Sequence, residues 1–206
     1  MNTSPIRRPL VMAGVLLLAA ALSPADSRDD WQQPDRVVAD FGLKPGSAIA
    51  DIGCGHGYFT FRLAQAVGKD GKVFAEDVDA KGLKTVENRA KKEGLANIEI
   101  VQGDGTNTKL PDACADVVAL VNVLHHAPKD QRPGLVKDAA RALKAGGTFF
   151  LVDWRVEATI GQDRDKRIPR DDLLKLVTDA GLVLDAEFLY LEHQVFLRFR
   201  KATAPK

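Results

Sequence analysis

Three glycines at alternating positions end an apolar run in residues 49–60, which read Ile-Ala-Asp-Ile-Gly-Cys-Gly-His-Gly-Tyr-Phe-Thr. Glycine lets the backbone bend sharply and lets a ligand approach it closely. We therefore expect a buried strand, a tight turn and the start of a helix, with Asp51 two residues before Gly53. Tyr58 stands where a dinucleotide fingerprint requires its last glycine, which argues against a nucleotide-dependent oxidoreductase.

Polar side chains also follow three further predicted strands. Residues 73–79 carry Asp77, which lies 20 residues after Gly57. That offset is close to the ~20 residues at which an acid meets ribose hydroxyls in nucleotide-binding βαβ units. A strand over residues 98–102 leads to Asp104, and one over residues 116–121 ends at Asn122. Ligands bind at the carboxyl ends of parallel strands, so these side chains indicate a binding site.

Two histidines and the end of a fifth strand add candidate catalytic groups. His125 and His126 follow Asn122, and histidine can take a proton or orient a substrate near neutral pH. The alternative is that one of them begins a helix and packs structurally. Asp153 and Trp154 end the strand predicted from residue 148, and we expect a substrate contact and a pocket wall there, respectively. Trp31 is either part of a lid or an apolar anchor.

Alternating strands and helices must position these residues. Apolar spacing, with proline and glycine near the ends, predicts helices over residues 35–41, 59–67, 80–93, 133–143 and 169–181. The two last β-rich segments, residues 182–191 and 194–200, are expected to pair antiparallel through a tight turn at Glu192 and His193. The alternation indicates an α/β fold with a Rossmann-like, doubly wound, mostly parallel sheet.

The motifs together resemble those of class I S-adenosylmethionine-dependent methyltransferases. The resemblance covers about residues 34–201 and rests on Asp51-x-Gly53-x-Gly55-x-Gly57, Asp77-Val78-Asp79, Gly103-Asp104, Asn122-Val123-Leu124-His125-His126 and Leu143-Lys144-Ala145-Gly146-Gly147. It is most similar to small bacterial members that begin with a Trp-Gln-x-Pro segment, here Trp31-Gln32-Gln33-Pro34. The resemblance implies a seven-stranded sheet closed by an antiparallel strand, and S-adenosyl-L-methionine as the cofactor.

The resemblance also assigns expected roles to residues of this chain. A glycine turn cradles the methionine part of the donor, an acid lies near its ammonium, a second acid binds the ribose, a third accepts from the adenine amino group, and an asparagine faces the methyl group. In this sequence those positions are Gly53, Gly55 and Gly57, then Asp51, Asp77, Asp104 with the Gly105 backbone beside it, and Asn122. No metal is expected.

The expected reaction is in-line methyl transfer to a small-molecule acceptor. A sulfonium methyl is already activated, so the protein aligns the reactants and excludes water, and a general base is needed only for a poor nucleophile. Asn122-Val123-Leu124-His125 differs from the Asn-Pro-Pro-aromatic signature of enzymes that methylate amino groups of bases or glutamine. The alternative is a protein that binds S-adenosylmethionine without turnover, as a sensor or scaffold.

Composition indicates one globular domain that does not bind nucleic acid. The chain has 206 residues, of which 45% are hydrophobic and 28% charged. Beyond residue 25 there remain 27 basic and 28 acidic side chains, which leaves no excess of basic residues for nucleic acid. Cys54 and Cys114 are predicted at opposite ends of neighbouring strands, roughly 15 Å apart, too far for a disulfide. No sequence feature addresses the oligomeric state.

Residues 1–25 resemble a secretory signal, and residues 26–206 form the predicted domain. Arg7 and Arg8 precede thirteen residues, 10–22, that are all apolar or glycine. The arginines lie before the apolar run and acids follow it, so an uncleaved segment would also place the domain outside the cytosol, with membrane association. A cytoplasmic location is the alternative, because S-adenosylmethionine is made inside cells.

Overall fold

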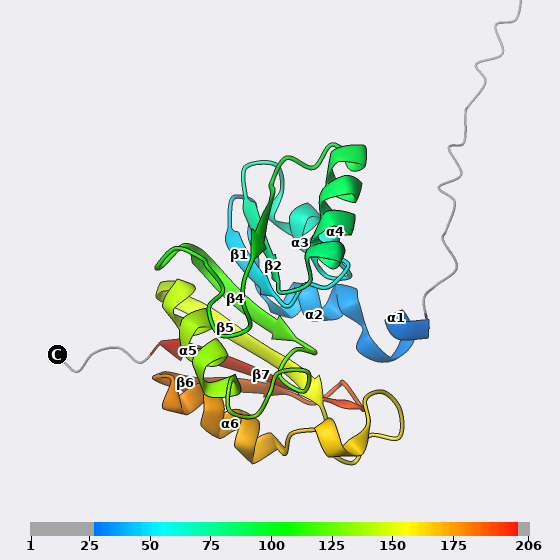
Figure 1. The fold of residues 1–206 in the computed structure, drawn as a ribbon, viewed down its shortest axis with the longest axis vertical. Helices are drawn as coiled ribbons and strands as arrows, with labels where there is room; N and C mark the ends of the chain where they lie inside the picture. Colours follow the sequence, from blue (N-terminus) through cyan, green and yellow to red (C-terminus); the bar gives the residue numbers. More distant parts are fainter. Residues whose placement is uncertain (1–26, 202–206) are drawn as a thin grey trace, which may run out of the picture.

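The computed structural model describes residues 27–201 (Figure 1). The strands are β1 (Ala48–Ile52), β2 (Lys72–Asp77), β3 (Ile98–Gln102), β4 (Ala115–Val121), β5 (Leu143–Trp154), β6 (Leu182–Phe188) and β7 (Gln194–Lys201). The helices are α1 (Ser27–Gln32), α2 (Pro34–Asp40), α3 (Thr60–Val67), α4 (Ala80–Glu93), α5 (Arg132–Ala142) and α6 (Arg170–Asp179), with a 3-10 turn at Arg164–Lys166. The predicted signal-like segment lies outside the described residues. Between residues 27 and 201, no helix combines the length and apolar character needed to cross a membrane.

All seven strands join one sheet, in the order β3-β2-β1-β4-β5-β7-β6. The first five pair in parallel, and β7 lies antiparallel to both β5 and β6. The chain runs outward from β1 to β3 and returns to the other side of β1 to begin β4, so strand order reverses between β1 and β4. A crevice opens at the carboxyl ends of the strands at such a point. The predicted α/β class, mostly parallel sheet and antiparallel C-terminal hairpin are confirmed.

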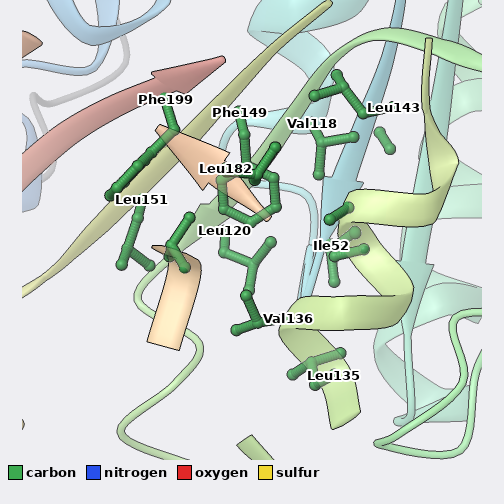
Figure 2. Close-up of a cluster of buried hydrophobic side chains, with 14 of the residues drawn as sticks. Ile52, Val118, Leu120, Leu135, Val136, Leu143, Phe149, Leu151, Leu182 and Phe199 are labelled. Atoms are coloured by element: carbon green, nitrogen blue, oxygen red, sulfur yellow. The ribbon is translucent and has the colours of Figure 1, made fainter. Parts of the chain in front are cut away.

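Side chains alternate across the sheet, so the central strands are buried on both faces. In β5, Phe149 packs in a core with Val136 of α5 and Val177 of α6, while Phe150 packs on the other face with Leu63 of α3. Figure 2 shows the first of these cores, where side chains of α5 meet those of β4, β5 and the two last strands. This two-sided burial fixes the register and hence the positions of the residues at the strand ends.

The last hairpin differs from the prediction in its first strand. β6 ends at Phe188 instead of residue 191, and residues 189–193 connect it to β7. The Tyr190 hydroxyl donates to Asp40 Oδ2 at 2.7 Å, and the Leu191 side chain is fully buried. These contacts hold the connection against α2, so it does not continue the ladder with β7.

Three further outcomes concern segments near the site. Helix α1 was not predicted, and β5 begins at Leu143 instead of residue 148, because Leu143 already pairs with Ala115 before the register shifts. Cys54 and Cys114 are both free thiols, as predicted.

Candidate functional site

The glycine turn after β1 uses its three glycines in different ways. All three have positive φ angles, +70° at Gly53, +56° at Gly55 and +86° at Gly57. A Cβ on Gly53 would lie 2.5 Å from a methyl of Val123, and one on Gly57 would lie 2.6 Å from the Phe61 ring. A Cβ on Gly55 would meet no atom within 4 Å. Gly53 and Gly57 therefore allow close packing, whereas Gly55 faces open space.

Two of the predicted acids lie against this turn. Asp77 is half-buried at the end of β2, where its Oδ2 accepts from the Gly55 N–H at 2.7 Å and its Oδ1 from the Asp79 N–H at 2.8 Å. Asp51 is 3% exposed and accepts from the Thr60 hydroxyl at 2.7 Å. Burial raises the pKa of Asp51 to about 6, although the Thr60 hydrogen bond opposes this. Both carboxylates retain lone pairs for a ligand that donates hydrogen bonds.

Asp104 and Gly105 lie in the loop after β3. Asp104 is exposed, and its carboxylate accepts from the backbone N–H groups of Thr106 and Asn107 at 3.2 and 2.9 Å. The Lys109 ammonium lies 2.8 Å from its Oδ2, and this hydrogen bond holds the pKa of Asp104 well below its ordinary value. The carboxylate is thus ionised and available as an acceptor at the edge of the crevice.

A fourth acid, Glu76, was missed from the sequence. It is 3% exposed, and its Oε2 lies 3.4 Å from the Gly53 nitrogen, which donates to it. Gly103 makes room for it, since a Cβ there would lie 1.9 Å from Glu76 Oε1. Burial raises its pKa to about 8. The adjacent Asp77 was found because it lies 20 residues after Gly57, a spacing typical of ribose-binding acids, whereas no local sequence pattern pointed to Glu76.

Asn122, directly after β4, has a strained backbone and a fixed side chain. Its φ of +61° is rare outside glycine, and strain of about 1–3 kcal/mol at such a residue is typical of functional sites. Its backbone N–H donates to the Val152 carbonyl at 2.8 Å. Its side-chain amide is held between two buried amides, accepting from Gln194 Nε2 and donating to Gln32 Oε1 at 3.4 Å. Asn122 therefore presents a rigid polar group at the strand end.

The two candidate catalytic histidines occupy a turn after Asn122, with contrasting surroundings. His125 is 4% exposed, and its Nδ1 lies 2.6 Å from Asp153 Oδ1. His126 is exposed, and its ring centroid lies 4.1 Å from that of His125. Desolvation by the surrounding residues, followed by the neighbouring His125, lowers the pKa of His126. Neither residue begins a helix.

An aromatic wall closes one side of the site. The rings of Trp154, at the end of β5, and Trp31, in α1, have centroids 4.8 Å apart. Gly161 lies against the Trp154 indole, where a Cβ would be only 2.3 Å away. Helix α1 also brings Arg28 to the site, with its guanidinium 3.8 Å above the Tyr58 ring. The contacts of Trp31 and Arg28 depend on α1, which was not predicted, so sequence reasoning did not reveal Arg28.

These side chains line two neighbouring cavities of about 560 and 770 Å³. Both cavities are lined by Gly53, Gly55, His56, Asp77, Asn122 and His126. The smaller one adds Arg28, Trp31, Asp51, Cys54, Tyr58, Phe59, Val121, His125, Trp154, Gly161 and Gln162. The larger one adds Ile52, Glu76, Val78, Asp79, Asp104, Gly105, Val123, Ala127, Pro128, Gln131 and Leu135.

The structure therefore brings most of the predicted site residues to one crevice, and leaves two away from it. Gly57 lines neither cavity and instead accommodates Phe61. Asp153 is 1% exposed and lies behind His125, so it reaches the cavity through that ring and not directly. Within residues 27–201, no three His, Cys, Asp or Glu side chains are grouped to hold a metal ion.

Comparison with known proteins agrees with this architecture. A solved S-adenosylmethionine-dependent methyltransferase from Aquifex aeolicus has a TM-score of 0.77 and 24% sequence identity, over 84% of this chain and 92% of that one. Residues 49–147 match the family described as a methyltransferase domain. Residues 49–147 therefore carry a methyltransferase domain, within a chain that has the class I methyltransferase fold. Its fold is shared more widely, since the [4+2]-cyclase SpnF has a TM-score of 0.70 at 16% identity, over 84% of this chain and 82% of that one.

Curated methyltransferases match part of their length. The demethylmenaquinone methyltransferase of Geobacillus stearothermophilus is 31% identical over 117 residues, which are 57% of this chain and 49% of that protein. The 27-O-demethylrifamycin SV methyltransferase of Amycolatopsis mediterranei is 32% identical over 121 residues, 58% of this chain and 43% of that protein. The chain therefore spans about half the length of the curated relatives it matches.

The cofactor of this methyltransferase family is S-adenosyl-L-methionine, and the residues of the crevice fit it. This donor carries an ammonium, a sulfonium and two ribose hydroxyls, which are cationic or hydrogen-bond-donating groups. Asp51, Asp77 and Asp104 supply acceptors along the two cavities, and a carboxylate accepts from such groups. Arg28 lines the smaller cavity together with Asp51 and provides a cation for the donor's carboxylate.

Proposed function

We propose that the chain transfers the methyl group of S-adenosylmethionine to a small-molecule acceptor. The observation that carries this proposal is the Asp77 carboxylate, held against the Gly55 N–H at 2.7 Å where both cavities meet. An acid tied to the glycine turn is positioned to accept from ribose hydroxyls beside that turn. Asp51 supports the ammonium end and Asp104 the adenine end. The bound donor supplies an activated methyl group, and the residues of the chain align the acceptor with it and exclude water.

The acceptor is proposed to be small and at least partly apolar. The cavity beside Trp31 and Trp154, about 560 Å³, is within the ~300–1,000 Å³ typical of small-molecule sites. The named relatives act on demethylmenaquinone and on 27-O-demethylrifamycin SV, which are small molecules. The near-neutral charge balance gives no support to a nucleic-acid acceptor.

The test is methyl transfer from an isotope-labelled donor to a panel of phenols, thiols, amines and carbon acids, read by product mass. We expect transfer to at least one class, a large loss in Asp77→Ala and a smaller one in Asp77→Asn, which keeps one acceptor oxygen. Asp70→Ala is the matched control, because its side chain is 80% exposed beside Lys69, away from both cavities. Donor binding without transfer to any acceptor would contradict the proposal and favour a sensor or scaffold.

We also propose that residues 1–25 export the domain or attach it to a membrane. The support is Arg7 and Arg8 followed by thirteen apolar or glycine residues. Cell fractionation of the full-length chain and of a chain lacking residues 1–25 tests this. Movement of the protein to the cytosol on deletion is expected, and a cytosolic full-length chain would contradict it.

A further inference from the structure

His125 and Asp153 form a buried pair whose geometry fixes the proton on the histidine ring. Asp153 accepts three hydrogen bonds, from the Trp154 N–H at 2.8 Å, the His125 N–H at 3.3 Å and the His125 ring at 2.6 Å. A carboxylate can only accept, and two backbone N–H groups already point at this one. Nδ1 must therefore carry a proton, and in the neutral form of the ring Nε2 keeps its lone pair.

His125 lines the smaller cavity, and its second ring nitrogen, Nε2, is not sealed within the protein. Nε2 makes no hydrogen bond to any residue between 27 and 201, and in that same range the only sealed polar side-chain atom without a partner is Asn97 Oδ1. Nε2 is thus accessible although the residue is 4% exposed, and His125 lines the smaller cavity with Asp51 and Asn122. An acceptor in this cavity can reach it. His126 lacks such an arrangement, since no carboxylate among the described residues holds its ring.

We propose that His125 is a general base and that Asp153 is its positioning residue, so that the acceptor is a phenol methylated on oxygen. This rests on the proposed methyltransferase function. A neutral hydroxyl is a poor nucleophile and gains from loss of its proton, whereas a thiol ionises readily and a neutral amine already has a free lone pair. The indoles of Trp31 and Trp154 line the same cavity and suit an aromatic ring.

The phenolic proton moves to His125 Nε2, making an imidazolium that Asp153 stabilises. The phenolic oxygen uses its electron pair to form a bond to the methyl carbon as the carbon–sulfur bond of the donor breaks. That electron pair stays on sulfur, so the sulfonium becomes a neutral thioether. The imidazolium afterwards returns its proton to water.

The first test needs no turnover. Nitrogen NMR of histidine-labelled, full-length protein reports which ring nitrogen carries the proton, with His125→Gln used to assign the signal. We expect the Nδ1–H form for His125 at neutral pH, and loss of this preference in Asp153→Asn. An Nε2–H form, or a ring that carries both protons, would overturn the proposal. This measurement tests the tautomer of His125 and the positioning role of Asp153 even for a chain that methylates none of the phenols tried.

The second test uses 4-methylphenol, 4-cyanophenol and 4-nitrophenol, which are increasingly acidic. In His125→Gln we expect kcat for 4-methylphenol to fall by ~100- to 10,000-fold, the usual contribution of a general base, and the loss to shrink for 4-nitrophenol. The donor affinity should be retained. His193→Gln, in the connection between β6 and β7, is the matched control that leaves activity unchanged.

Outcomes of the second test separate the two proposals. An equal loss for all three phenols would overturn the general-base role, because a base no longer matters once the phenol is ionised. Transfer to thiols or carbon acids but to no phenol would overturn the acceptor class and leave the methyltransferase function standing. Absence of donor binding in the unmutated chain would instead remove the function itself.

Discussion

Substitution of single glycines in the turn after β1 separates packing from ligand binding. Gly57 has φ +86°, and an added Cβ would lie 2.6 Å from the Phe61 ring and 3.1 Å from Val86. Gly55 has φ +56° with nothing near. An alanine at a left-handed position costs about 1–2 kcal/mol, and overpacking a buried contact adds about 1–3 kcal/mol. We therefore expect Gly57→Ala to lower the free energy of unfolding by about 2–5 kcal/mol, and Gly55→Ala by about 1–2 kcal/mol.

Urea unfolding of each variant measures these losses, and calorimetry with S-adenosylmethionine measures donor affinity. Gly55 lines both cavities and Gly57 lines neither, so affinity should fall in Gly55→Ala and be retained in Gly57→Ala. Introducing Phe61→Leu should relieve most of the overpacking and bring the cost of Gly57→Ala close to that of Gly55→Ala. Equal stability losses in the two glycine variants, or loss of donor binding only in Gly57→Ala, would refute this reasoning.

Two further predictions follow from buried acids. Burial raises the pKa of Asp51 to about 6, and the donor's ammonium favours the ionised carboxylate. Donor affinity should therefore fall about tenfold per pH unit below pH 6 in the unmutated chain and be nearly independent of pH in Asp51→Asn. Calorimetry from pH 5 to 8 checks this, and the same slope in both proteins would contradict it. Burial raises the pKa of Glu76 from 4.5 to about 8, so its neutral form is favoured in the folded chain. The contribution of Glu76 to the free energy of unfolding is fully present below pH 4.5 and is lost as the pH rises to about 8. Glu76→Gln should abolish this slope and exceed the unmutated chain in stability at pH 9 by up to roughly 5 kcal/mol in urea unfolding, whereas parallel pH profiles would show that Glu76 is not responsible.

The fold and the strand-end residues could be predicted because their signals are local. A glycine turn after an apolar run and an acid at a set distance, Asp77, follow from short-range geometry and from sheet topology. The Asp153–His125 pair could not be predicted, since it joins residues 28 apart through the register of β4 on β5. Sequence reasoning placed Asp153 in the substrate pocket, whereas the structure places it behind the ring that lines the cavity.

The other missed features also depend on tertiary packing. Arg28 reaches the cavity only because α1 folds against Tyr58, and nothing in residues 27–32 marks that contact. Glu76 points inward because Gly103, on the neighbouring strand end, leaves room for it. The glycine spacing predicted a turn, but equal spacing did not show that Gly55 borders the cavity while Gly57 supports Phe61. The roles of the individual site residues remain predictions.

The most direct test of the central claim is calorimetric titration of the full-length chain with S-adenosylmethionine and S-adenosylhomocysteine, beside Asp77→Ala and Asp70→Ala. We predict micromolar binding of both ligands that Asp77→Ala abolishes and Asp70→Ala preserves. Failure of the folded, unmutated chain to bind either ligand would contradict the assignment of a methyl-donor site to this crevice.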